Sequence, residues 1–165
     1  MKVMAKLLAV SVLAAATLTS NAIAGQKAPT IVEIATGINE TTGEFSTLIA
    51  ALKHTGLVDA LNGKKQFTVF APTDAAFAKL NLDATSITNL PPDAVADILL
   101  YHVAPGKRPS QAVAGSKQIK MLNGDFALIG PGPTVDGAKV ILPDVKASNG
   151  IIHVVEDVLL PPTDE

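Results

Sequence analysis

The chain has 165 residues, of which 48% are hydrophobic and 17% charged, with a formal net charge of −2 and no cysteine. The lack of cysteine excludes disulfides and thiol nucleophiles, so the fold must be held by packing alone. With no Trp, one Tyr, five Phe and no run of basic residues, the chain lacks the charge and the aromatic platforms that bind nucleic acid.

The first residues have the pattern of a secretory signal peptide. Lys2 and Lys6 accompany the apolar stretch LLAVSVLAAATL, which is too short to span a bilayer, and a small-x-small triplet ends at Ala24. We expect residues 1–24 to be cleaved, leaving one domain over 25–165 with a net charge of −4 and no transmembrane segment. The predicted location is therefore secreted or periplasmic, and the absence of cysteine favours a bacterial envelope.

The N-terminal part of the chain after the signal peptide is predicted to be helical. Residues 30–38 and 45–61 carry apolar residues at helical spacing, with a break near Thr55-Gly56. The segment QFTVFA at 66–71 is short and rich in β-branched and aromatic residues, which is typical of a buried strand.

Pro72 ends this strand, and a helix is expected to begin at Ala75. Thr73 or Asp74 can accept hydrogen bonds from the first amides of that helix. Phe77 and Leu80 are expected to form its inward face.

A further helix follows Pro91 and Pro92, and Pro105-Gly106 is expected to close it. Beyond Ser116 the pattern changes to strands separated by three turn sequences, which are Asn123-Gly124-Asp125, Asp136-Gly137 and Asn149-Gly150. Asn-Gly is the preferred pair for a two-residue hairpin turn. Helices in the N-terminal half followed by antiparallel strands indicate an α+β fold and argue against a parallel βαβ fold.

Three segments in this order resemble the fasciclin (FAS1) domain family. TVFAPTDAAFAKL at 68–80, with Thr73 and Asp74, is similar to the first signature block of that family. LLYHV at 99–103 is similar to its Tyr-His motif. ASNGIIHVVEDVLLPP at 147–162, which holds Asn149, Gly150 and His153, is similar to its second block.

The resemblance implies a compact antiparallel β wedge or sandwich decorated by helices. It also implies an exported module for adhesion or protein interaction that is not an enzyme. In animal matrix members, integrin-binding sites are assigned to the Tyr-His segment and to an Asp-Ile motif. By position these are Tyr101-His102 and Pro143-Asp144. Val145 replaces the Ile and Lys146 replaces an apolar residue, which argues against an integrin as the partner.

Sequence patterns for catalysis and metal binding are weak. His54, His102 and His153 include no closely spaced pair, so no metal site and no cofactor is predicted. His102 is expected to be a core imidazole held by a local hydrogen bond. There is no Gly-x-Ser-x-Gly elbow and no phosphate loop.

Three functions remain open. The first is an exported interaction module that binds a protein or polysaccharide of the cell surface or matrix. Its candidate contact residues are Tyr101, His102, Pro143 and Asp144. The second is a carrier of a small apolar ligand such as a pigment or lipid, an exception known within the resembled family. The third is a polysaccharide hydrolase that uses two of five carboxylates, namely Asp93, Asp97, Asp144, Glu156 and Asp157.

Overall fold

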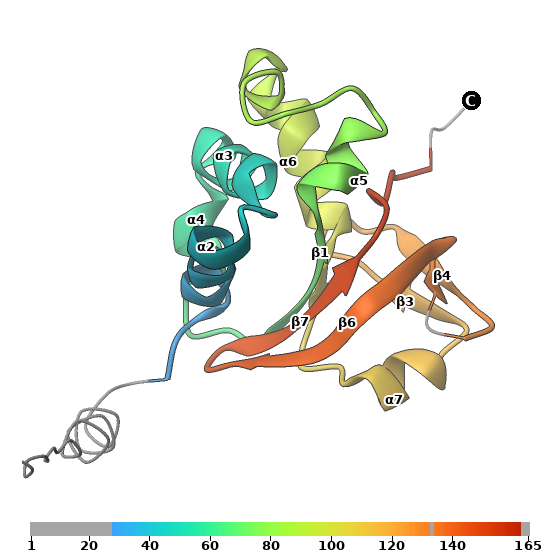
Figure 1. Ribbon diagram of the computed structural model, residues 1–165. Coiled ribbons are helices and arrows are strands. Elements are labelled where there is room, and N and C mark those ends of the chain that lie inside the picture. Colours follow the sequence, from blue (N-terminus) through green and yellow to red (C-terminus); the bar gives the residue numbers. More distant parts are fainter. Residues whose placement is uncertain (1–27, 133, 163–165) are drawn as a thin grey trace, which may run out of the picture.

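The computed structural model describes residues 28–132 and 134–162 (Figure 1), so the predicted signal peptide at 1–24 lies outside the described residues. The helices are α2 (Ile31–Thr42), α3 (Ser46–Thr55), α4 (Leu57–Leu61), α5 (Asp74–Ala78), the 3-10 turn η2 (Ile87–Asn89), α6 (Pro92–Tyr101) and α7 (Ser110–Ala114). The strands are β1 (Phe67–Pro72), β2 (Val103–Pro105), β3 (Gln118–Lys120), β4 (Phe126–Gly130), β5 (Thr134–Val135), β6 (Ala138–Ala147) and β7 (Gly150–Val155). None of these helices combines the length and the apolar character needed to cross a membrane.

The predicted N-terminal helices are confirmed. A capping box starts α2, because the Thr30 side chain accepts from the Glu33 amide while the Glu33 carboxylate accepts from the Thr30 amide. The predicted break falls at Gly56, which ends α3 with a φ of +72° and allows α4 to leave in a new direction.

The strand-to-helix corner at Pro72 is confirmed, with one change in the role of Asp74. Thr73 caps α5 by accepting from the Ala76 amide at 3.3 Å. The Asp74 carboxylate instead accepts from the amides of Ser46 at 3.2 Å and Thr47 at 2.8 Å. Those amides open α3, so Asp74 caps a helix that precedes it by 28 residues rather than its own.

Two element ends differ from the sequence prediction. Leu80 is 38% exposed, because α5 stops at Ala78 and the chain turns before Leu80 can face the core. Helix α6 ends at Tyr101 rather than near Pro105-Gly106. The reason is that residues 103–105 pair with residues 67–69 and form β2.

Seven strands form one sheet in the order β2-β1-β7-β6-β5-β4-β3. The α+β class and the predominance of antiparallel pairing are confirmed, although β1 and β7 run parallel. The predicted turn at Asp136-Gly137 joins β5 to β6, with φ values of +51° and +83°. Figure 1 shows α2, α3, α4 and α6 on one side of the central strands and α7 on the other.

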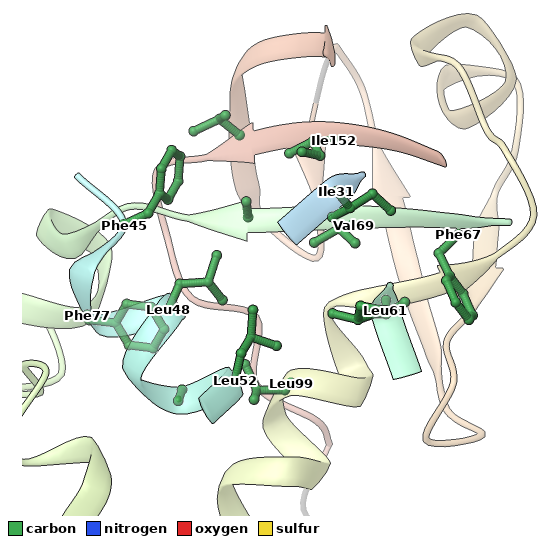
Figure 2. Packing of buried hydrophobic residues seen from close by; sticks show 14 of the residues in the cluster. Ile31, Phe45, Leu48, Leu52, Leu61, Phe67, Val69, Phe77, Leu99 and Ile152 are labelled. Atoms are coloured by element: carbon green, nitrogen blue, oxygen red, sulfur yellow. The ribbon is translucent and has the colours of Figure 1, made fainter. Parts of the chain in front are cut away.

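Strands β1 and β7 are buried on both faces, and alternate residues enter two apolar clusters. Val69 and Ile152 face the cluster beneath α2, α3 and α6, part of which Figure 2 shows. Phe70 and Val155 face the second cluster, which the remaining strands and Val113 of α7 complete. This two-sided burial explains why β1 does not alternate between apolar and polar residues, although it includes the buried Thr68.

The hairpin predicted at Asn149-Gly150 forms, but these two residues are not its central pair. Gly150 already pairs with Ala147, so the turn residues are Ser148 and Asn149. The Asn149 side chain is buried, where its Oδ1 accepts from the Ile31 amide at 3.0 Å and its Nδ2 donates to the Leu61 carbonyl. The Asn-Gly pair therefore serves packing rather than a left-handed turn.

Strand β6 is longer than its partner on one side. Strand β5 pairs only with Ala138 and Lys139, whereas β7 pairs along most of β6. The register shifts twice between Val140 and Val145, and Ile141 and Leu142 are about half exposed, at 49% and 50%. Within residues 28–132 and 134–162, the outer edge of β6 beyond Lys139 thus has no strand beside it.

Replacing Gly150 by Ala is expected to destabilise the fold strongly. A Cβ at this position would lie 2.0 Å from the Phe67 carbonyl oxygen and 2.6 Å from Cδ1 of Ile31, so the β1–β7 pair would have to separate. We expect a loss of roughly 3 kcal/mol or more in the free energy of unfolding, measured by urea denaturation. Gly37→Ala is the matched control: nothing lies within 4 Å of its Cβ position, and Ala in a helix should stabilise by about 0.5–1 kcal/mol. Equal stability of the two variants would contradict this packing.

Candidate functional site

A groove of about 350 Å³ lies between α7 and the β6–β7 pair. Its lining is mostly apolar and comprises Ser110, Gln111, Val113, Ala114, Gly132, Val140, Pro143 and His153. Ligand pockets in proteins are typically concave, mainly apolar and of about 300–1,000 Å³. The groove therefore has the size and character of a small binding site.

Asp144 stands at the rim of this groove and is exposed, yet its backbone and side chain are both fixed. It adopts a φ of +58° within the irregular part of β6. Its Oδ1 accepts from the Ser110 amide at 2.7 Å, and its Oδ2 accepts from the Ser110 hydroxyl at 2.5 Å. These two bonds lower the pKa of Asp144, so it is charged at neutral pH.

His153 supports the same region from within the sheet. Its Nδ1 accepts from the Asp144 amide at 3.1 Å, so its Nε2 carries the hydrogen and donates to the Arg108 carbonyl at 2.8 Å. The imidazole is buried and stacks on Phe70, with ring centroids 5.5 Å apart. His153 thereby joins the irregular part of β6 to the loop that precedes α7.

Tyr101 lies in the second apolar cluster and is almost fully buried. Its hydroxyl donates to Asp136 Oδ2 at 3.2 Å and lies 3.4 Å from the Phe126 carbonyl oxygen. Burial, with the neighbouring charge of Asp136, raises the pKa of Tyr101 to about 12. Tyr101 is placed to hold the β5–β6 turn and presents no free surface.

His102 is buried as well, as expected of a core imidazole held by a local hydrogen bond. Its Nε2 accepts from the Leu159 amide at 2.8 Å, so its Nδ1 carries the hydrogen and donates to the Ile98 carbonyl at 2.7 Å. Burial lowers the pKa of His102 to about 4, against an opposing effect of the bond to Ile98. The neutral ring thus fastens the C-terminal segment to the end of α6.

The structure separates the sequence-predicted site residues into groups. Pro143, Asp144 and His153 meet at the groove. Tyr101 and His102 are interior, Thr73 and Asp74 cap helices, and Asn149 and Gly150 lie at the β6–β7 turn.

The sequence analysis missed Ser110 and Gln111, because α7 has only five residues and so shows no helical periodicity. The one local signal was Pro109 before Ser110, which suits the start of a helix.

Stability should fall in acid because of His102. The unfolded imidazole takes up a proton below about pH 6.5, whereas the folded one resists until about pH 4. The unfolded state therefore binds more protons in this window, and roughly 3 kcal/mol of stability is lost as the pH falls through it. In urea denaturation of His102→Asn, the free energy of unfolding should change less steeply with pH in this window. The difference in slope should correspond to up to one proton taken up on unfolding. His54→Gln controls for removal of an imidazole as such, and an unchanged slope in His102→Asn would contradict the assignment.

Comparison with known proteins gives the family. The model of the Fasciclin domain matches residues 43–161. Protein sll1483 of Synechocystis sp. is 46% identical over 144 residues, which cover 84% of this chain and 77% of that protein. Cell surface glycolipoprotein MPB83 of Mycobacterium bovis is 36% identical over 127 residues, which cover 72% of this chain and 56% of that protein.

A solved structure supports the same fold. The FAS1 domain pair of the insect cell adhesion molecule Fasciclin I aligns with a TM-score of 0.59 and 22% identity. The alignment covers 80% of this chain and 51% of the insect chain, so this chain spans about half of that pair. Together, the family match over 43–161 and the 46% identity to the Synechocystis protein show that this chain belongs to the Fasciclin domain family.

Proposed function

We propose that this chain is an exported, non-enzymatic interaction module that binds a protein or polysaccharide partner at the cell envelope or matrix. The contact surface would be the groove together with Pro143 and Asp144, called here the groove face. One relative is named as a cell surface glycolipoprotein, and the structural neighbour comes from a cell adhesion molecule. These names and the predicted signal peptide support an exported role.

The observation that carries this proposal is the rigidity of an exposed, charged rim beside an open groove. Asp144 is held by two bonds to Ser110 and one to His153, so little conformational entropy is lost when a partner binds it. Tyr101 and His102 would act on partners only indirectly, through the segments that their buried side chains hold.

The residues that line the groove favour binding of a partner over hydrolysis of a polysaccharide. The described residues that line the groove carry no carboxylate, and glycoside hydrolysis commonly uses a pair of carboxylates on either side of the scissile bond. The bonds from Ser110 lower the pKa of Asp144 at the rim, which suits a fixed charge rather than the protonated general acid of a glycoside hydrolase.

Filling the groove should weaken partner binding strongly. Ala114 lines the groove and is exposed, so Ala114→Trp would occupy it without removing core contacts. Capture of cell-surface protein or polysaccharide from the native host by the immobilised chain should fall about tenfold or more. Ala112→Trp is the matched control on the same helix, because Ala112 is exposed but does not line the groove. Equal capture by both variants would remove the groove from the contact surface.

A second candidate function is carriage of a small apolar ligand in the same groove. The mostly apolar lining and the volume of about 350 Å³ favour it. Gln111 offers a side-chain amide with no hydrogen-bond partner within residues 28–132 and 134–162, enough to orient a ligand with a single polar group.

Native mass spectrometry of the chain purified from its own host would test the carrier function. We expect a bound apolar molecule that is retained in Ala112→Trp and lost in Ala114→Trp, since only the second side chain enters the groove. A chain that is consistently empty would reject carriage while leaving partner binding intact.

A further inference from the structure

A second hollow, of about 210 Å³, lies at the β6–β7 turn, and we call it the polar pocket. Its polar side chains are Thr30, Asn62, Lys64, Gln66, Ser148 and Asn149. It borders the cluster under α2 and α4, whereas the groove borders the cluster that contains Val113 and Val140. The polar pocket is therefore separate from the groove face.

The frame of the polar pocket is fixed by one partly buried and two buried hydrogen bonds. The Thr30 hydroxyl donates to Asn62 Oδ1 at 2.7 Å, which sets the orientation of that amide. Asn149 makes bonds to Ile31 and Leu61, so the turn cannot shift relative to α2 and α4. Because these residues are already held in place, little conformational entropy is lost when a ligand binds the polar pocket.

Several hydrogen-bonding groups in the polar pocket have no partner within residues 28–132 and 134–162. They are the Asn62 Nδ2, the Lys64 ammonium group and the Gln66 side-chain amide. The Ser148 hydroxyl oxygen in the wall is buried and also unpaired. Asn62, Lys64 and Gln66 are exposed, so their amide and ammonium groups are open to a ligand. The cost of about 1–3 kcal/mol for an unmade buried hydrogen bond applies here to Ser148 alone.

The charge of the polar pocket is opposite to that of the protein. Among the described residues that line it, Lys64 is the charged one and none carries a carboxylate. The nearby Glu33 carboxylate accepts from the Thr30 amide as part of the α2 capping box. The chain as a whole has more acidic than basic residues. An anionic group is thus favoured at this position.

We propose that the polar pocket binds an acidic sugar residue of a polysaccharide, with the sugar carboxylate on Lys64. The amides of Asn62 and Gln66 supply both donors and acceptors, which suits neighbouring sugar hydroxyls. A phosphate would instead call for several cations or clustered backbone amides. This binding does not depend on the groove face, so either site can fail without the other.

The test uses the intact chain and a uronate oligosaccharide prepared from alginate. Saturable binding is expected by isothermal titration, with chemical-shift changes at the side-chain amides of Asn62 and Gln66. Lys64→Gln should weaken binding about tenfold or more, because it removes a charge-assisted bond. Lys65→Gln is the matched control, an exposed neighbour that does not line the polar pocket, and should change binding less than about twofold.

Three outcomes would overturn the proposal. The first is no saturable binding of the uronate oligosaccharide, which would make the hollow a water-filled depression. The second is equal loss in Lys64→Gln and Lys65→Gln, which would mean diffuse attraction to basic residues. The third is binding of a neutral cello-oligosaccharide or a glutamate-rich peptide as tightly as the uronate. The groove variants Ala114→Trp and Ala112→Trp should leave uronate binding unchanged.

Discussion

The buried amide of Asn149 is the interaction on which the arrangement of helices and sheet depends. It joins the first amide of α2 to the last carbonyl of α4 from a position at the tip of the β6–β7 hairpin. Gly150, the next residue, lets that hairpin approach β1 so closely that no side chain would fit. Buried polar groups are costly unless every bond is made, and here the bonds of one residue select one docking of the helices on the strands.

A second constraint of the same kind operates at the other end of β1. Asp74 caps α3 although it belongs to α5, so the two helices and the strand between them are fixed in one geometry. The domain has no disulfides, and such side-chain caps across long stretches of sequence take over part of their role. Asp74 and Asn149 themselves lie within the segments that resemble the fasciclin signature blocks, and their partners lie outside them. The resembled blocks thus include residues that hold the helices in place. The groove face and the polar pocket are both built upon this frame.

Much of the fold could be predicted from local sequence patterns. Helix α2, the break at Gly56, the buried strand β1 and the hairpin regions follow from periodicity, capping residues and turn residues. The predictions that were wrong concern residues whose structure depends on partners far away in the sequence. Residues 103–105 became a strand because β1 lies beside them. Asn149 does not form the Asn-Gly turn that its sequence favours, because the Ile31 amide and the Leu61 carbonyl bond to its buried side chain. Ser110 and Gln111 were missed because five residues are too few to show a period.

The irregular middle of β6 has a consequence for the protein in a crowded environment. A long strand with one open side is a template for pairing with other chains, and such pairing leads to aggregation. Here the left-handed Asp144 and the neighbouring Pro143, which has no amide hydrogen, interrupt the ladder where β5 no longer covers it. The irregular stretch of β6 that borders the groove is thus also a poor template for edge-to-edge pairing with a neighbouring molecule.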